Sequence, residues 1–232
     1  MEGMILAAGL GTRLRPLTDH CSKALVKVGD RTLLDLAIER LSGAGVEHIV
    51  VNVHHFADMV ENYILSHTWP CRISLSDERR MLLDTGGALS HAAPLFSGRD
   101  DVLVHNVDIL TDIDLQALCR WHRAEGNLAT LCASRRHTRR MLSFRNGLLV
   151  GRAPDGQVEN GCEALAFSGV SIVSPRLFDL LPAADTPFPI IDEYLRLGAA
   201  GHRIGAFIHD PTHWLDVGKP ETLKQAEQWT VS

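Results

Sequence analysis

The sequence lacks the marks of membrane, secreted and nucleic-acid-binding proteins. No apolar run reaches the roughly 18 residues that span a bilayer, and the N-terminal segment 1–8 has no basic region of the kind that precedes a signal peptide. The five cysteines are odd in number and form no C-x-x-C pair, which favours a reduced, cytoplasmic compartment. The formal net charge is −5, whereas a protein that binds nucleic acid normally needs a basic face. We therefore expect no membrane partner and no nucleic-acid partner.

What the sequence has is an ordinary globular composition. Of its 232 residues, 45% are hydrophobic and 22% are charged, values that suit a chain with a sizeable core. Basic residues concentrate only over 135–140, with the sequence Arg-Arg-His-Thr-Arg-Arg. Two interpretations of this run stay open: a solvated turn, or a loop that faces phosphate.

Strands and helices alternate through residue 134. Short β-branched or apolar runs predict strands at Met4–Ala8, His48–Val53, Arg72–Ser76, Asp101–Val107 and Asn127–Ser134. Helical spacing predicts helices at Leu33–Ala44, His55–Leu65, Gly86–Leu95 and Leu115–Glu125. This alternation predicts an α/β fold of three layers, a Rossmann-like αβα arrangement around a mixed, mostly parallel sheet.

The character of the chain changes after residue 134. Segments Met141–Leu149 and Glu163–Val173 read as strands separated by turns, and they predict a small β-rich annex over the sheet. We expect helices near Pro175–Leu181 and Ile190–Ala200, a strand at Ile204–Ile208 and a helix at Pro220–Trp229. No repeat or linker divides the chain, so we expect one domain over 1–232.

The strongest local signal is a glycine-rich loop, Gly9–Arg15, directly after the first strand. Gly9 and Gly11 let the backbone approach a ligand, and Arg13 supplies a planar charge that matches phosphate. The dinucleotide fingerprint G-x-G-x-x-G is broken at Leu14, and no Walker A string occurs. Lys23, shortly downstream, is a surface charge or a second phosphate contact.

Several aspartates lie where a parallel sheet presents its ligands. Asp108 follows the strand Asp101–Val107, and Asp216 lies 108 residues later. Mg²⁺ prefers one or two carboxylates plus substrate phosphates, so the pair becomes informative if the fold brings it together. We interpret Asp112 and Asp114 as turn and cap residues. Segment 84–87, Asp-Thr-Gly-Gly, either caps a helix or recognises a base or sugar.

Five motifs in this order resemble the sugar-1-phosphate nucleotidyltransferase family, across essentially the whole chain. Leu6–Pro16 matches L-A-A-G-x-G-x-R-x-x-P, and Ser22–Val28 matches P-K-x-L-x-x-V from its lysine onward. Leu83–Gly87, Phe167–Val170 and Trp214–Gly218 match D/E-T-G-G, F-[ST]-G-[IV] and W-x-D-V-G. The chain looks most like the short, single-domain members of the N-acetylmuramate-1-phosphate uridylyltransferase and mannose-1-phosphate guanylyltransferase types.

The resemblance implies a division of the chain and a role for each matching residue. Residues 1–134 would form the nucleotide-binding part, and 135–232 would form the acceptor-binding part and complete the sheet. The nucleotide would contact Leu6, Ala7, Ala8, Gly9, Gly11, Thr12, Arg13, Asp77 and Gly86. The sugar phosphate would contact Lys23, Asn106, Glu163 and Gly169. Mg²⁺ would be held by Asp108 and Asp216, and the catalytic residues would be Arg13, Lys23 and Asp108.

The implied reaction transfers a nucleoside monophosphate from a nucleoside triphosphate (UTP, GTP or CTP) to a sugar 1-phosphate. The alternatives are a cytidylyltransferase acting on a non-sugar phosphate such as phosphocholine, and a non-catalytic nucleotide sensor. Two positions depart from the family. Val107 stands where N-G-D has glycine, and Ala164 follows Glu163 where many members have a lysine. The oligomeric state stays open.

Overall fold

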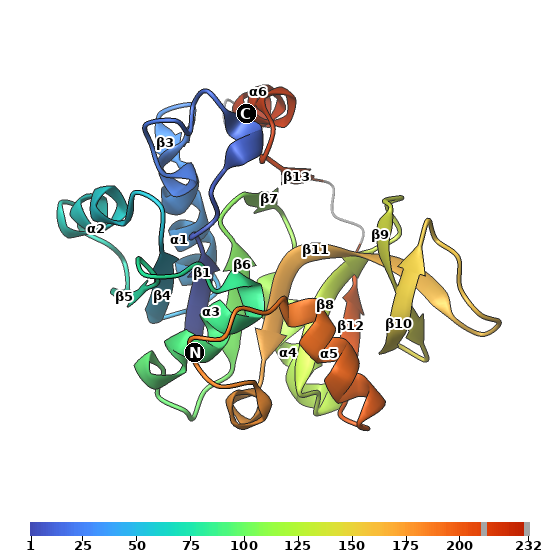
Figure 1. The fold of residues 1–232 in the computed structure, drawn as a ribbon. Helices are drawn as coiled ribbons and strands as arrows, with labels where there is room; N and C mark the ends of the chain where they lie inside the picture. The colour runs from blue at the N-terminus through green and yellow to red at the C-terminus, as the bar shows by residue number, and fades with distance from the viewer. Residues whose placement is uncertain (210–212, 230–232) are drawn as a thin grey trace.

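A computed structural model describes residues 1–209 and 213–229 of the chain (Figure 1). Its strands are β1 Glu2–Leu6, β2 Lys27–Val28, β3 Arg31–Thr32, β4 His48–Val53, β5 Arg72–Asp77, β6 Val102–Asn106, β7 Ile109–Thr111, β8 Ala129–Ser134, β9 Arg140–Arg145, β10 Leu148–Pro154, β11 Glu163–Val173, β12 Ile204–Ile208 and β13 Trp214–Asp216. Its α-helices are α1 Leu33–Gly43, α2 Ala57–Leu65, α3 Asp84–Ala92, α4 Leu115–Glu125, α5 Ile190–Ala199 and α6 Pro220–Trp229. Short 3₁₀ turns are η1 Thr12–Leu14, η2 Lys23–Leu25, η3 Ala93–Leu95 and η4 Pro175–Leu180.

A nine-stranded sheet organises the molecule, in the order β5-β4-β1-β6-β11-β8-β12-β10-β9. The first four strands are parallel, as the alternation of strands and helices predicted. From β6 onward the neighbouring strands pair antiparallel, except β8 with β12. The mixed α/β sheet is therefore confirmed, and its parallel part is the half built from residues 2–106.

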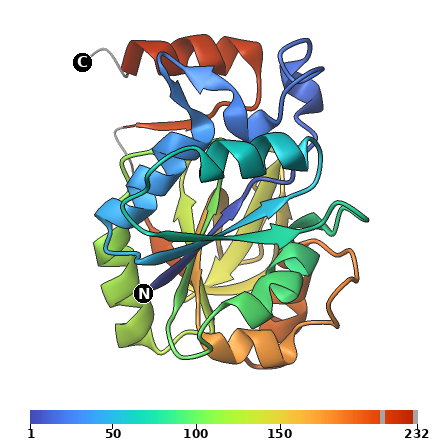
Figure 2. The same cartoon turned by 90° about the vertical axis from the view of Figure 1, so that its left-hand side faces the viewer.

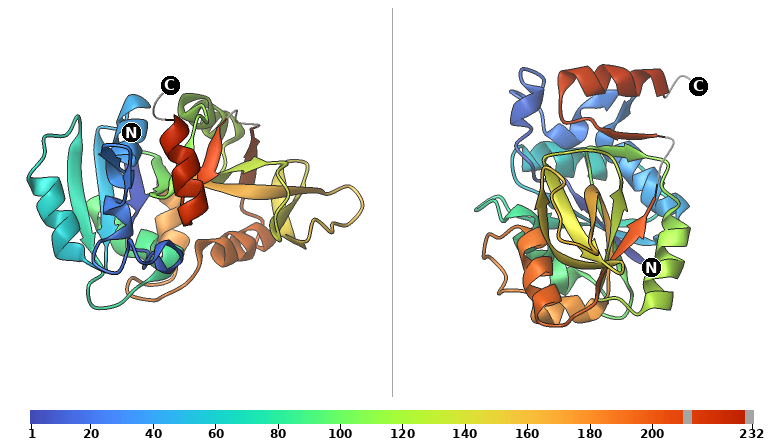
Figure 3. Two further views of the ribbon diagram at one scale, coloured as in Figure 1. Left: turned by 90° about the horizontal axis from the view of Figure 1, so that it is seen from above. Right: turned by 90° about the vertical axis from the view of Figure 1, so that its right-hand side faces the viewer.

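The β-rich annex is part of this sheet and does not lie over it as a separate layer. The C-terminal half of β11 pairs with β6, and its N-terminal half pairs with β9. Pairings from β11 through β8, β12, β10 and β9 thus return to β11. The right-hand panel of Figure 3 looks at this curled end of the sheet. The cause is the length of β11, whose eleven residues serve two neighbours on the same side.

Helices cover both faces of the sheet, which gives the predicted three layers. One buried cluster joins the sheet to α1, α2, α4 and α6, and the other joins it to α3, η4 and α5. Figures 1 and 2 show α6 beside the β2–β3 hairpin at one end of the molecule. Among the described residues, no helix combines the length and apolar character needed to cross a bilayer.

Helix boundaries follow local chemistry. The Thr32 side chain accepts a hydrogen bond from the Asp35 backbone, and the Asp35 carboxylate accepts one from Thr32, which forms a capping box at the start of α1. Gly126, with a positive φ of 61°, ends α4. Helix α3 begins at Asp84, two residues before the predicted start, and Asp84 itself has a positive φ of 59°.

Candidate active site

A cleft of about 570 Å³ lies where the parallel strands end. Strands β1, β4 and β6 run side by side, so Leu6 and Asn106 meet at one edge of the sheet. The residues lining the cleft come from the glycine-rich loop, the strand ends and the start of α3: Leu6, Ala8, Gly9, Lys23, Asn52, Glu78, Leu82, Asp84, Thr85, Asn106, Asp108 and Pro187. The structure therefore brings the first loop and the fourth predicted strand end into one site.

Tight backbone geometry forms the glycine-rich loop. Gly11 has a positive φ of 64°, and a Cβ there would lie 2.8 Å from the Thr18 methyl group. The Thr18 hydroxyl donates to the Gly11 carbonyl at 2.8 Å. Any side chain at this position would be strained and crowded, so glycine is required. Arg13 follows in η1, half exposed beside the cleft.

Two polar residues that sequence reasoning missed, Asn52 and Glu78, support the backbone just before this loop. The Ala7 backbone N–H donates to Asn52 Oδ1 at 2.7 Å, and Asn52 Nδ2 donates to Glu78 Oε1 at 2.7 Å. The Leu83 N–H donates to the other Glu78 oxygen at 3.2 Å. Burial raises the pKa of Glu78, against the lowering effect of these hydrogen bonds. The Ala7 N–H, expected to face the nucleotide, is committed to Asn52.

Lys23 and Asp108 form a largely buried ion pair at the bottom of the cleft. Lys23 Nζ donates to Asp108 Oδ2, and each side chain is 12% exposed. The two residues lie 85 positions apart in sequence, so this pair joins η2 to the segment that follows β6. A cation and a carboxylate that both line the cleft are thus paired with each other.

A short ribbon brings Asp216 to Asp108. Strands β7 and β13 are antiparallel, with Asp216 opposite Ile109, and the Val217 N–H donates to the Asp108 carbonyl at 2.9 Å. Asp108 therefore lies opposite Val217, one position along the ribbon from Asp216. Arg13 Nη2 lies 3.6 Å from Asp216 Oδ2, so the loop and the ribbon also meet.

Gly218 lies beside the contact between Arg13 and Asp216, and both side chains occupy the space next to its Cα atom. Its N–H donates to Asp216 Oδ1 at 2.9 Å, and a Cβ there would lie 2.6 Å from Arg13 Nη2. A side chain at the glycine of the W-x-D-V-G motif would therefore displace the Arg13 guanidinium or the Asp216 carboxylate.

The donor set suits Mg²⁺ shared with a substrate. The described residues contain no cluster of three or more His, Cys, Asp and Glu side chains of the kind that binds a metal without help. A Mg²⁺ that is also held by phosphates usually takes one or two carboxylates from the protein, and Asp108 and Asp216 would supply these.

Gly169 and Asn106, both expected at the sugar phosphate, lie next to each other. Gly169 has a positive φ of 76°, and a Cβ there would lie 2.6 Å from the Ile109 side chain and 3.1 Å from Asn106 Nδ2. It sits where the pairing of β11 with β8 shifts register between Phe167 and Ser171. Such bulges re-aim the chain next to binding sites.

Behind this bulge lies a chamber of about 210 Å³ with mainly apolar walls. It shares Leu6, Thr85 and Asn106 with the main cleft. Its other lining residues are Leu89, Val104, Phe167, Gly169, Ser171, Ile190, Ile191 and Tyr194. A small substituent of a ligand bound at Asn106 can therefore enter an apolar space.

Val107, which replaces the family glycine, does not narrow the cleft. Its side chain is 2% exposed and belongs to the core cluster of α1 and α4. Its N–H donates to the Leu6 carbonyl at 3.2 Å, which continues the β1–β6 pairing by one residue.

Three expected contacts lie elsewhere or have another cause. Asp77 does not line the cleft; its carboxylate accepts from Arg79 Nη1 at 2.6 Å on the outer surface. Glu163 begins β11 and accepts from Arg135 Nε at 2.9 Å, away from the cleft lining. Gly86 does not line the cleft, and a Cβ there would lie 2.3 Å from the Phe188 ring, which is reason enough for glycine at this position.

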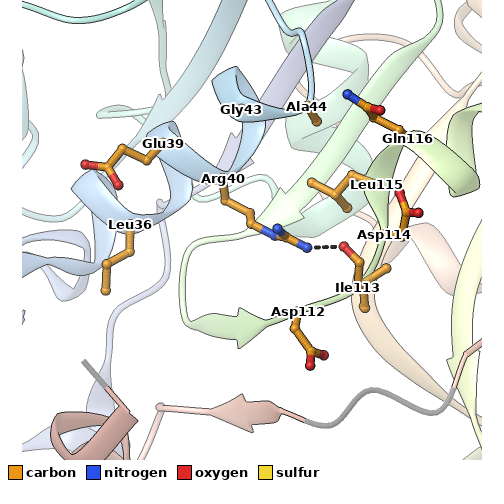
Figure 4. Close-up of a pocket in the computed structure, with 10 residues that line it drawn as sticks. All are labelled: Leu36, Glu39, Arg40, Gly43, Ala44, Asp112, Ile113, Asp114, Leu115 and Gln116. Atoms are coloured by element: carbon orange, nitrogen blue, oxygen red, sulfur yellow. Dashed lines mark hydrogen bonds between the residues drawn. The ribbon is translucent and has the colours of Figure 1, made fainter. Parts of the chain in front are cut away.

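A second hollow, of about 510 Å³, lies between the end of α1 and the start of α4 (Figure 4). Arg40 reaches across it and donates to the Ile113 carbonyl, while Asp112 and Asp114 flank the same loop. None of the residues that line it lines the cleft. The Arg40 hydrogen bond ties the loop after β7 to α1, and this loop is continuous with the ribbon that carries Asp216.

Comparison with known proteins places this geometry in context. The sequence matches the nucleotidyl transferase family over residues 2–144. The N-acetylmuramate alpha-1-phosphate uridylyltransferase of Caulobacter vibrioides is 35% identical over 237 residues, which cover 97% of this chain and 94% of that protein. The mannose-1-phosphate guanylyltransferase catalytic subunit beta of Xenopus tropicalis is 29% identical, over 95% of this chain and 62% of that subunit. HddC from Yersinia pseudotuberculosis has a similar fold, with a TM-score of 0.80, 20% identity and 99% coverage of both chains.

Proposed function

The chain belongs to the nucleotidyl transferase family, and we propose from this premise that its cleft joins UTP to an N-acylated sugar 1-phosphate. It is a sugar-1-phosphate nucleotidyltransferase, which transfers a nucleoside monophosphate from a nucleoside triphosphate and yields a nucleoside diphosphate sugar and pyrophosphate. The choice of UTP and of N-acetylmuramate 1-phosphate is the finer part of the proposal.

One observation supports the site assignment most directly. Four charged residues from separate parts of the chain form two ion pairs, Lys23 with Asp108 and Arg13 with Asp216. The Asp108 backbone pairs with Val217, the residue after Asp216, so the two ion pairs are joined by the ribbon. A sensor that only binds nucleotide would not need both carboxylates beside both cations. A reaction between two phosphate anions needs this balance of charge.

The chemistry can proceed without a general base. The second pKa of a phosphate monoester is about 6, so the acceptor oxygen is already ionised at neutral pH. That oxygen attacks the α-phosphorus of the triphosphate and forms a new O–P bond. The bond from the α-phosphorus to the bridging oxygen breaks, and its electron pair leaves with pyrophosphate.

Each residue then has a positioning or charge-balancing role. The loop Gly9–Thr12, held by Asn52, would support the triphosphate, and Arg13 would balance the leaving pyrophosphate. Lys23 would reduce repulsion between the two reacting anions. When held by Asp108 and Asp216, Mg²⁺ would supply further charge neutralisation for both phosphates.

The acceptor class follows from the apolar chamber. An unsubstituted hexose gains little from apolar walls, whereas an N-acyl or ether substituent buries its methyl groups there. The match covers 94% of the uridylyltransferase relative but only 62% of the guanylyltransferase relative. Both facts support N-acetylmuramate 1-phosphate with UTP. The five free cysteines suit a reaction in the reducing cytoplasm.

A pyrophosphate-release assay over a grid of substrates tests the proposal. UTP, GTP and CTP are each paired with N-acetylmuramate 1-phosphate, mannose 1-phosphate and phosphocholine, with Mg²⁺ present or chelated. We expect the highest kcat/KM for UTP with N-acetylmuramate 1-phosphate, and no turnover after chelation. A preference for CTP with phosphocholine would support the cytidylyltransferase alternative, and no turnover with any pair would refute a transferase.

A further inference from the structure

Arg136 differs from the other residues of the basic run 135–140. It lies two residues beyond β8, and its guanidinium is partly buried, whereas Arg135 and Arg139 are exposed. Arg136 Nη2 donates to the Phe167 carbonyl. Its Nε is buried and has no hydrogen-bond partner among the described residues. Neither a solvated turn nor a phosphate-facing loop describes this residue.

The guanidinium stacks on an aromatic ring of the C-terminal half. Arg136 Cζ lies 3.8 Å from the centroid of the Trp214 ring. Trp214 Nε1 donates to the Ser168 carbonyl at 2.9 Å. Arg136 and Trp214 therefore both hold the two residues that precede Gly169, the bulge on the acceptor side of the cleft.

Trp214 and Asp216 lie on one face of β13, because alternate residues of a strand point to the same side. Arg136 thus packs on the face that carries the Asp216 carboxylate. Burial lowers the pKa of Arg136, and the charge of Asp216 opposes that shift, which places the two groups within electrostatic reach. The cation is close to Asp216 without forming a direct ion pair.

We propose that Arg136 is a positioning residue for nucleotidyl transfer, which links the acceptor-binding bulge 167–169 to the strand that carries Asp216. The inference rests on the proposed function of that carboxylate. A guanidinium can donate in its plane and stack on its face at the same time, and a lysine ammonium cannot. One side chain therefore fixes two separate segments that must hold acceptor and nucleotide at a set distance.

The test compares Arg136→Met and Arg136→Lys with the exposed neighbour variant Arg139→Gln. An activity-independent measurement is the half-saturating concentration of Mn²⁺ in the presence of α,β-imido-UTP, followed by electron paramagnetic resonance. The kinetic measurement is the KM of the acceptor sugar 1-phosphate. Loss of a group that orients a metal ligand typically costs about 10–100-fold, and we expect increases of that size in both quantities for Arg136→Met.

The other variants complete the pattern. Arg136→Lys should resemble Arg136→Met, because charge alone does not replace the stacked, in-plane contact, and Arg139→Gln should resemble the wild type. A lower thermal midpoint with unchanged Mn²⁺ binding and unchanged acceptor KM would reduce Arg136 to a structural residue and overturn the inference. If the wild type releases no pyrophosphate with any acceptor, the proposed function fails, while the Mn²⁺ titration still decides the role of Arg136.

Discussion

His105 makes the stability of this protein depend on pH below neutrality. The residue lies in β6, directly before Asn106, and its side chain is 1% exposed. Its Nδ1 contacts the Asn106 carbonyl at 2.8 Å, and its Nε2 is buried without a partner among the described residues. Burial lowers the pKa of His105 from 6.5 to about 4, with a smaller opposing effect of the Asn106 carbonyl.

The sign of the effect follows from proton binding. The unfolded chain binds the His105 proton near its ordinary pKa of 6.5, and the folded protein binds it only near pH 4. Between these values the unfolded state holds more protons, so stability is complete above pH 6.5 and falls as the pH drops toward 4. From pH 7.5 to pH 5 the expected loss is about 2 kcal/mol in the free energy of unfolding.

Urea denaturation of the wild type and of His105→Asn across this pH range measures the effect. Asparagine keeps an N–H that can reach the Asn106 carbonyl but does not titrate. Other groups, such as Glu78, change charge in both proteins, so the difference between the two curves isolates His105. The exposed His202→Asn variant serves as the control and should follow the wild type. If the wild-type and His105→Asn curves stay parallel from pH 7.5 to pH 5, this reasoning is wrong.

Three further predictions concern the cleft and its walls. Asp216→Asn should lower kcat by at least about 100-fold and raise the Mg²⁺ requirement, whereas Asp112→Asn, at the outer end of the same ribbon, should keep both near wild type in a pyrophosphate-release assay. Ile191→Trp, which fills the apolar chamber, should raise the KM of an N-acylated acceptor about 10-fold or more and leave the KM of UTP unchanged. If the variant and the wild type have the same KM for the acceptor, the chamber is not part of the acceptor site. Gly86→Ala should lower the free energy of unfolding by about 1–3 kcal/mol through overpacking, while Gly43→Ala, where a Cβ meets no atom within 4 Å, should not destabilise the protein in the same urea titration.

The parallel half of the fold could be predicted because its signals are local. Each strand is a continuous apolar run, and each helix shows its own spacing, so β4, α4 and the position of Asp108 at the end of β6 followed from segments of about ten residues. The glycine-rich loop was equally visible, because a positive φ after a strand restricts the residue type.

The rest depended on pairings between distant segments. Strands β7 and β13 have three residues each, too few to show a period, and only their pairing brings Asp216 to Asp108. Asn52 did carry a signal, since a polar residue in a fully buried strand must find a hydrogen-bond partner. Glu163 was expected at the acceptor because it stands where many family members have the glutamate of a Glu-Lys pair, but the first part of β11 runs along β9 and takes Glu163 away from the cleft.

The β7–β13 ribbon also sets an order of events during synthesis. Asp108 leaves the ribosome 108 residues before Asp216 does. At ordinary elongation rates that interval is roughly 5–20 s. Under the proposed function, transfer competence arrives only when β13 pairs with β7 and brings Asp216 next to the Asp108 backbone, one of the last steps of chain synthesis.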